Sequence, residues 1–389
     1  MTINLFDDNS WLSLKPLTFT RPVADLRVGI LTIAEKWGKH LKATFGYQTQ
    51  AYLREKYSLI DASLYINGAI CPDEALLEAV TALKEGEVLV KGDVVIAYSS
   101  TDEMNYQQAK LSLKPVEFSR EFNHIVYPEH IFGYNAEEIK KDFSLITKGR
   151  SSASVSSTNN ILGDQIFFEE GATAECSNLN SLQGPIYLAK NAQIWEGSSI
   201  RGAFALGENS STKMGTKIYP GTSIGHNCRV GGEINNIVIW GNSSKGHDGY
   251  MGNSVMGEWC NLGADTNNSN LKNNYSQVKL YDYQTKQMRN TGLQFCGVII
   301  GDHSKAGINT MFNTGTVVGV SANVYGAGFP PNFIADFSWG GADGFTPYQI
   351  QKMFETAKIM MARKNIALTI ADQNILSHIF ENTEEYRDF

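Results

Sequence analysis

In the second half of the chain an aliphatic residue returns at every sixth position. The first run comprises Leu188, Ile194, Ile200, Leu206, Ile218, Ile224 and Val230, with a break at Thr212. A second run has the same step, at Ile300, Ala306, Phe312, Val318 and Val324. A step of six does not fit an α-helix of 3.6 residues per turn, because the marked face would rotate away. It fits three short flat sides per coil, whose inward side chains build an apolar column. The spacing predicts a left-handed parallel β-helix of hexapeptide repeats over residues 161–345.

The segment between the two runs is polar. It extends from Leu271 to Gly297 and contains Asn273, Asn274, Tyr275, Gln284 and Arg289. We interpret it as a loop thrown out of one coil. Loops on repeat proteins usually fall on the binding face.

The pattern changes to a helical period in residues 346–389. Thr346 before Pro347 indicates a capped amphipathic helix over Thr346–Asn365, and a second helix is predicted over Asp372–Tyr386. The first helix carries a stripe of methionines, which favours packing over a ligand pocket because Met fills gaps in cores. We expect both helices to cover the open end or the side of the β-helix.

Residues 1–147 mix helical and strand periods and predict an α/β domain. Helices are expected over Ile30–Leu41, from Ala51 toward Tyr57 and over Ala136–Phe143, and a β-hairpin over Glu87–Tyr98. A Ser-rich stretch from Lys148 to Asn160 is the expected linker.

Composition narrows the class of protein. The 389 residues suggest two or three domains, and 36 Gly beside 10 Pro suggest many tight turns. The net charge of −7, from 33 basic and 40 acidic residues, and the lack of a basic run argue against nucleic acid as the main partner. The 5 Cys are scattered without a CxxC pair, so we expect neither a metal site nor disulfides. No secretion signal and no membrane-spanning stretch is evident, which favours a cytoplasmic protein.

Candidate chemistry lies in the middle of the repeats. Lys245, His247, Tyr250 and Gly252 are followed by Asn261-Leu262-Gly263-Ala264 and then by Asn267, Asn268 and Asn270. These segments resemble the acetyltransferase domain of the GlmU-like bifunctional family, which acetylates glucosamine 1-phosphate and then uridylylates the product. That family has a Lys-x-x-His-x-x-Tyr segment with a following Gly, and later an Asn-Ile-Gly-Ala and a Cys-Asn-Tyr. The likeness covers about residues 180–330.

The resemblance implies roles for residues at matching positions. His247 matches the catalytic base, which suits an imidazole that must take a proton from an amine before the amine attacks a thioester. Lys245, Tyr250, Asn261 and Asn270 match positions that hold the sugar phosphate or assist the base. Acetyl-CoA would lie along the later coils near Gly307, Thr310 and Gly326. The resemblance also implies a homotrimer.

Several residues depart from the family pattern and leave alternatives open. Lys245 stands one residue closer to His247 than the family's Lys, and Ser269-Asn270-Leu271 replaces Cys-Asn-Tyr. The bend at His247 could be a solvated turn, and the three Asn could form a structural ladder. His226 and His303 lack motif support and are expected on the surface.

The N-terminal segment has a weaker resemblance, to sugar-phosphate nucleotidyltransferases. Pro16-Leu17-Thr18-Phe19-Thr20-Arg21-Pro22 is similar to that family's Pro-Leu-Thr-x-x-Arg-Pro-Lys, which makes Arg21 a candidate nucleotide-binding residue. The Gly-rich loop that the family uses upstream is absent. Asp7 and Asp8 stand there instead and would repel phosphates unless a metal intervened.

Three functional hypotheses follow. The first is CoA-dependent acyl transfer, from acetyl-CoA or another acyl-CoA, to an amino sugar phosphate or nucleotide amino sugar. The second is Mg²⁺-dependent nucleotidyl transfer to a sugar 1-phosphate by the N-terminal domain, with the β-helix as scaffold. The third is a catalytically silent protein that binds a sugar nucleotide. The first is the one we favour from the sequence.

Overall fold

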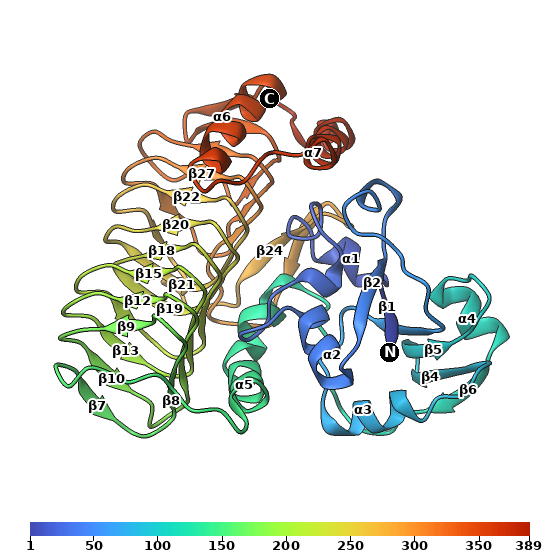
Figure 1. The fold of residues 1–389 in the computed structure, drawn as a ribbon. Coiled ribbons are helices and arrows are strands. Elements are labelled where there is room, and N and C mark those ends of the chain that lie inside the picture. Colours follow the sequence, from blue (N-terminus) through green and yellow to red (C-terminus); the bar gives the residue numbers. More distant parts are fainter.

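A computed structural model describes residues 1–389 and contains an N-terminal α/β unit, a long parallel β-helix and two C-terminal helices (Figure 1). No helix combines the length and apolar character needed to cross a bilayer. The fold class expected from the sequence is confirmed.

The N-terminal unit is built on a six-stranded mixed sheet with the order β2-β1-β3-β5-β4-β6. Strand β1 lies parallel to β2 and β3, while β4 and β5 form the predicted antiparallel hairpin. The strands are β1 (Thr2–Phe6), β2 (Thr44–Gln48), β3 (Leu64–Asn67), β4 (Glu87–Lys91), β5 (Val94–Ser99) and β6 (Lys114–Glu117). The helices are α1 (Ser10–Ser13), α2 (Ile33–Leu41), α3 (Glu74–Thr81), α4 (Tyr106–Ser112) and α5 (Pro128–Thr147).

Two of the three expected N-terminal helices are confirmed. Helix α2 begins at Ile33 because Thr32 and Glu35 form a reciprocal capping box there. Helix α5 includes the expected 136–143 and is longer, since Pro128 at its first position is compatible with a helix start. The expected helix from Ala51 is wrong beyond one 3₁₀ turn, Ala51–Leu53. Residues 148–159 form no strand or helix, as expected of a linker.

Each coil of the β-helix has three faces. Strands of the first face are β7 (Asn160–Leu162), β10 (Asn178–Asn180), β13 (Ser199–Arg201), β16 (Lys217–Ile218), the starts of β19 (Glu233–Ile239) and β21 (Tyr250–Met256), β23 (Asn267–Asn268) and β28 (Met311–Phe312). Strands of the second face are β8 (Ile166–Phe168), β11 (Ile186–Leu188), β14 (Phe204–Leu206), β17 (Thr222–Ile224), the ends of β19 and β21, β26 (Ile299–Ile300), β29 (Val317–Val318) and β31 (Phe333–Ile334).

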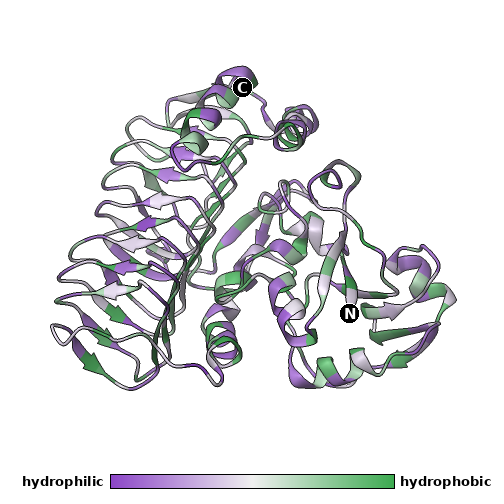
Figure 2. Cartoon of the chain, viewed as in Figure 1, coloured by the Kyte–Doolittle hydropathy of each residue, from purple (hydrophilic) through white to green (hydrophobic).

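The third face is a ten-stranded sheet. Its strands are β9 (Thr173–Ala174), β12 (Gln193–Ile194), β15 (Ser211–Thr212), β18 (Arg229–Val230), β20 (Ser244–Lys245), β22 (Asn261–Leu262), β27 (Lys305–Ala306), β30 (Asn323–Val324), β32 (Ser338–Gly341) and the antiparallel β33 (Gly344–Pro347). Neighbouring coils pair in parallel, as the repeat predicts, and each coil contains both hydrophilic and hydrophobic residues (Figure 2).

The six-residue series forms the interior of this column. Every member of both runs is buried. Thr212 is also fully buried, and its hydroxyl accepts a hydrogen bond from Trp195 N at 3.3 Å, which satisfies a polar atom in an apolar column. The first run ends at Val230 because the next coil is shorter, so that Val230 pairs with Lys245 only fifteen positions later.

The Leu271–Gly297 excursion is confirmed as an extrusion from one coil, and it contains the hairpin β24 (Lys279–Asp282) and β25 (Gln287–Asn290). It does not project freely. Arg289 makes a 2.7 Å ion pair with Glu129 of α5 and lies over the Tyr127 ring, and Tyr283 contacts Phe19 edge to face. The hairpin therefore lies between the β-helix and the N-terminal unit and contacts the latter (Figure 1).

The C-terminal helices are α6 (Ile350–Ala362) and α7 (Ile370–Asn382), followed by a 3₁₀ turn, Glu384–Tyr386. The expected cap at Thr346 is wrong, because Thr346 and Pro347 belong to β33 and pair with β32. Met353 and Met361 are buried, which confirms that the methionine stripe serves packing. Helix α7 also reaches the N-terminal unit through a 2.9 Å ion pair between Lys56 and Asp372.

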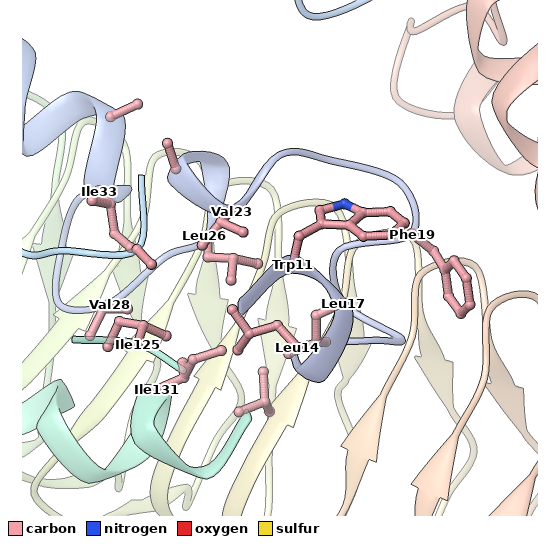
Figure 3. Close-up of a cluster of buried hydrophobic side chains, with 14 of the residues drawn as sticks. Trp11, Leu14, Leu17, Phe19, Val23, Leu26, Val28, Ile33, Ile125 and Ile131 are labelled. Atoms are coloured by element: carbon pink, nitrogen blue, oxygen red, sulfur yellow. The ribbon is translucent and has the colours of Figure 1, made fainter. Parts of the chain in front are cut away.

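One hydrophobic core joins the three parts. A cluster of 45 buried residues includes residues of the N-terminal sheet, the second face of the β-helix and both C-terminal helices. Near its centre, residues Trp11–Val28 pack against Ile125 and Ile131 beside the β-helix (Figure 3). A second cluster of 30 residues fills the β-helix. The second face is thus covered by the N-terminal unit, whereas the first face has no such cover.

Candidate functional site

His247 lies on a bend between the third and first faces, which we call the His247 corner (Gly231, Gly246, His247, Gly263, Ala264, Gly307, Ile308, Tyr325 and Gly326). The bend follows β20, and the His247 side chain is exposed. The glycines stack closely from coil to coil: a Cβ on Gly263 would come within 2.7 Å of Gly307. Glycine is therefore required along this corner because neighbouring coils approach too closely there for a side chain.

Lys245 fixes this bend from inside the β-helix. The side chain is 1% exposed and occupies the column position that Val230 has in the preceding coil. Its Nζ donates to the carbonyl oxygens of His247 at 2.6 Å, Asp248 at 2.9 Å and Gly231 at 3.3 Å. Burial lowers the pKa of the ammonium group to about 8.

This placement corrects the expected role of Lys245. An ammonium group that already donates to three backbone carbonyls inside the coil has no proton left for a substrate outside it. Lys245 positions the turn that carries His247.

Tyr250 and Asn270 come together on the first face. Asn270 Nδ2 donates to the Tyr250 hydroxyl at 2.9 Å and to Asn253 Oδ1 at 2.8 Å. The Tyr250 ring lies over Gly252, where a Cβ would come within 2.2 Å of the hydroxyl. Burial raises the pKa of the Tyr250 phenol, which keeps it a neutral hydrogen-bond donor. An aromatic ring beside amide groups is suited to a sugar.

The three neighbouring asparagines differ in role. Asn268 is buried, and its amide bonds the Gly252 N–H at 3.0 Å and the Gly252 carbonyl at 3.2 Å, so it is structural. Asn267 is exposed and accepts from Tyr250 N at 2.8 Å. A structural role, one of the two alternatives expected from the sequence, therefore holds for Asn268. Asn270 instead contacts the Tyr250 hydroxyl.

Asn261 lies apart from this group. It is exposed on β22 of the third face and lines a cavity of about 180 Å³ with Ser244, Arg229 and residues Met360, Arg363 and Lys364 of α6 and its end. Within one chain, then, Asn261 and the Tyr250–Asn270 pair belong to different faces.

The expected CoA-contacting residues lie at or beside the His247 corner. Gly307 stacks on Gly263 in the coil above His247, and Thr310 is buried with its hydroxyl on the Gly307 carbonyl at 2.9 Å. Thr310 can therefore support the corner but offers no surface to a ligand. Gly326 is exposed at φ +101°, beside the exposed Tyr325. Ile308 is 69% exposed and provides an apolar surface two coils above His247.

The N-terminal unit has a crevice of about 640 Å³ at the carboxyl ends of β1 and β2. Ligands of open α/β sheets bind at such ends. Asp7 and Asp8 line it. Burial raises the pKa of Asp7 to about 7, whereas the pKa of Asp8 falls to about 2, because the His124 ring at 3.5 Å and hydrogen bonds from Ser10 and Asn67 outweigh its burial. The crevice is acidic, with one basic residue, Arg54, among its lining.

Arg21 does not face this crevice, which corrects its expected nucleotide contact. Its guanidinium group is buried and pairs with Asp302 at 2.5 Å, Asp25 at 3.3 Å and Glu258 at 3.5 Å. Asp302 and Glu258 belong to the β-helix, and Thr20 donates to Asp302 at 2.7 Å. The Pro16–Pro22 segment therefore fastens the N-terminal unit to the β-helix.

His303 is a further correction, because it is buried rather than on the surface. It stacks on Trp259, and burial lowers its pKa to about 3, so it stays neutral. His226 is exposed as expected.

No group of three or more His, Cys, Asp or Glu side chains is arranged to hold a metal ion.

Comparison with known proteins identifies a family over the N-terminal unit. Residues 3–151 match the family model described as sugar nucleotidyl transferase. The chain is 36% identical over 104 residues to the bifunctional protein GlmU of Methanocaldococcus jannaschii, across 26% of this chain and 25% of that protein. It is 27% identical over 146 residues to a bifunctional sugar-1-phosphate nucleotidylyltransferase/acetyltransferase of Sulfurisphaera tokodaii, across 37% and 36%.

These matches make the chain a distant homologue of bifunctional GlmU-like transferases, although it spans only a quarter to about a third of those relatives' length. A solved structure of an Arabidopsis UDP-N-acetylglucosamine acyltransferase aligns with 60% of this chain and 91% of that one, at 15% identity and a TM-score of 0.25.

Proposed function

We propose that this protein transfers an acyl group, most simply acetyl, from CoA to the amine of an amino sugar that carries a phosphate or a nucleotide. The observation that carries the proposal is the anchored bend of His247: an exposed imidazole on a turn that Lys245 holds from inside, one step along the coil from the Tyr250–Asn270 pair.

In the reaction, the sugar amine loses a proton to the His247 imidazole and attacks the thioester carbonyl. A C–N bond forms, the C–S bond of the tetrahedral intermediate breaks, and the thiolate of CoA takes the proton. Backbone N–H groups are the candidates to stabilise the oxyanion of that intermediate. Tyr250 and Asn270 would hold the sugar, and the bare glycine corner with Ile308 would take the CoA chain.

We also propose a closed threefold assembly in the cytoplasm. The first face and its corners expose apolar side chains, among them Met214, Tyr219, Ile308 and Met311, while the second face is covered. A neighbouring subunit packed there could bring its third face, with Asn261, toward the His247 corner of the next. Light scattering measures the mass directly, and a monomer would contradict this part.

The test of the chemistry is release of CoA thiol from acetyl-CoA with a panel of amino-sugar phosphates and nucleotide amino sugars. Wild type should turn over at least one of them. His247→Gln should lose about 10²-fold or more, as expected for a lost general base, with unchanged circular dichroism.

A second candidate is nucleotidyl transfer, favoured by the family match over residues 3–151 and by the crevice at the ends of β1 and β2. Its acidic lining would require Mg²⁺ between the carboxylates and the phosphates. Magnesium-dependent pyrophosphate release from a nucleoside triphosphate and a sugar 1-phosphate, abolished by Asp8→Asn and retained in His247→Gln, would establish it.

A further inference from the structure

A large cavity lies between the N-terminal unit and the β-helix, away from both sites described above. Its volume is about 1240 Å³. One wall is α2 with the loop before it, a second is the end of α5 with the linker, and the third is the second face of the lower coils around Tyr187, Leu206 and Ile224. Small-molecule sites usually have volumes of roughly 300–1,000 Å³, so the cavity is large enough for a nucleotide.

Basic residues dominate the charged lining, although the whole chain has a net charge of −7. Five basic residues line the cavity, namely Arg27, Lys39, Lys42, Lys148 and Arg150, against the three acidic residues Glu35, Glu169 and Glu208. The basic side chains come from three separate segments of the chain, so they converge only in the folded protein.

Two of the acidic groups are already engaged. Glu169 pairs with Arg150 at 2.5 Å and accepts from the Tyr187 hydroxyl at 2.8 Å. Glu35 accepts from Thr32 N at 2.7 Å in the cap of α2. The remaining four basic side chains make no ion pair within the protein, and five basic against three acidic residues give the lining a net charge of about +2.

Arg27 is the most buried of these four basic residues, and a hydrogen bond fixes its side chain. It is half-buried, its Nη1 donates to the Ile30 carbonyl, and its Nη2 makes no hydrogen bond within the protein. A guanidinium group fixed at one nitrogen and free at the other is prepared for a phosphate oxygen. The opposite wall is backbone, because Gly207 and Gly225 stack so closely that a Cβ on Gly207 would come within 2.4 Å of Gly225.

Helix geometry explains only part of this arrangement. Lys39 and Lys42 lie at the end of α2, where a positive charge is favourable for the helix itself. The same reason applies to Lys148, the residue at the C-terminal cap of α5, but not to Arg27, which precedes α2. The convergence of Arg27 with the three lysines across an open cavity is what indicates a ligand.

We propose that this cavity binds a phosphorylated ligand of the size of a nucleoside diphosphate, with Arg27 on the phosphates and Lys39, Lys42 and Lys148 around them. Such a ligand would join α2 to the second face of the β-helix and stiffen the contact between the two units. The site shares no residue with the His247 corner or with the crevice at Asp7, so the inference stands independently of the proposed acyl transfer.

The experiment is calorimetric titration of the full chain with UDP and, separately, with inorganic pyrophosphate at low salt. Wild type should bind UDP, and binding should weaken as salt rises. Pyrophosphate binding of comparable strength would assign the affinity to the phosphates, whereas much weaker binding would add a contribution of the nucleoside.

Lys148→Glu is the decisive variant, because Lys148 is exposed on the linker and its replacement leaves the core intact. We expect it to weaken UDP binding by about tenfold or more, and Arg27→Gln to weaken it further. The matched control is Lys358→Glu, which makes the same charge change at an exposed residue of α6, outside this cavity and the N-terminal crevice, and should leave binding unchanged.

The proposal is overturned if neither probe binds. It is equally overturned if folded Lys148→Glu binds UDP as wild type does, or if Arg54→Gln alone abolishes binding, which would move the nucleotide to the other crevice. Circular dichroism of each variant ensures that a lost signal is not a lost fold.

Discussion

The buried ammonium group of Lys245 makes the stability of the β-helix depend on pH in a way that one substitution should remove. Lys245→Met keeps the length of the side chain and replaces the charge with a group that suits the apolar column between Val230 and Leu262. The three carbonyls that lose their donor lie at the bend of His247, and the cost of losing that donor does not depend on pH.

The magnitude follows from the pKa of Lys245. In the unfolded chain it is about 10.4, and burial lowers it to about 8 in the folded protein. Between these values the unfolded state binds more protons, so the free energy of unfolding rises with pH. Integrated from about pH 7 to about pH 9.5, this one group adds about 2 kcal/mol.

The assay is urea unfolding of wild type and Lys245→Met at both pH values, followed by circular dichroism. Other groups titrate in the same range, so the quantity of interest is the difference between the two proteins. That difference should shift by about 2 kcal/mol in favour of wild type as pH rises. Lys217→Met, on the exposed first face, should show no such shift. A constant difference for Lys245→Met would refute a buried, charged lysine.

Three other substitutions test the contacts that join the units and the sugar side of the site. Arg21→Gln should cost about 3–5 kcal/mol in urea unfolding, because it leaves buried carboxylates unpaired, whereas Arg54→Gln should cost less than about 0.5 kcal/mol. Arg289→Ala should cost about 1–3 kcal/mol by removing the partner of a buried glutamate, and faster proteolysis of the 271–297 excursion should accompany it. Tyr250→Phe should lower kcat/KM for the amino sugar by roughly two- to tenfold, the value of one hydrogen bond.

The repeat was predictable from the sequence because one side chain per flat side must point inward wherever the coil has regular length. The six-residue step did not identify Lys245 as an inward-pointing residue, because the coil before it is shorter. Lys245 stands before Gly246 as Val230, Leu262 and Ala306 stand before their glycines, and that shared place in the corner motif was the available signal that it points inward. We missed this signal because a lysine is not expected at an inward position of an apolar column.

Contacts between distant segments could not be predicted in this way. Arg21 was expected in a nucleotide site because its flanking motif is similar to one, but its partner Asp302 lies 281 positions away. Likewise, the polar excursion after Asn270 was expected to be a binding loop, and the structure fastens it to α5 through Arg289. Ion pairs of this kind are set by the docking of two units, which local sequence patterns do not encode.

The most direct test of the central claim is CoA thiol release by wild type and His247→Gln with the same amino-sugar acceptors. The account predicts measurable turnover by wild type and a loss of about 10²-fold or more in the variant, with unchanged fold and unchanged CoA binding. Equal turnover in the two proteins would contradict the assignment of His247 as the base. A wild-type protein that neither binds CoA nor releases thiol would contradict acyl transfer itself.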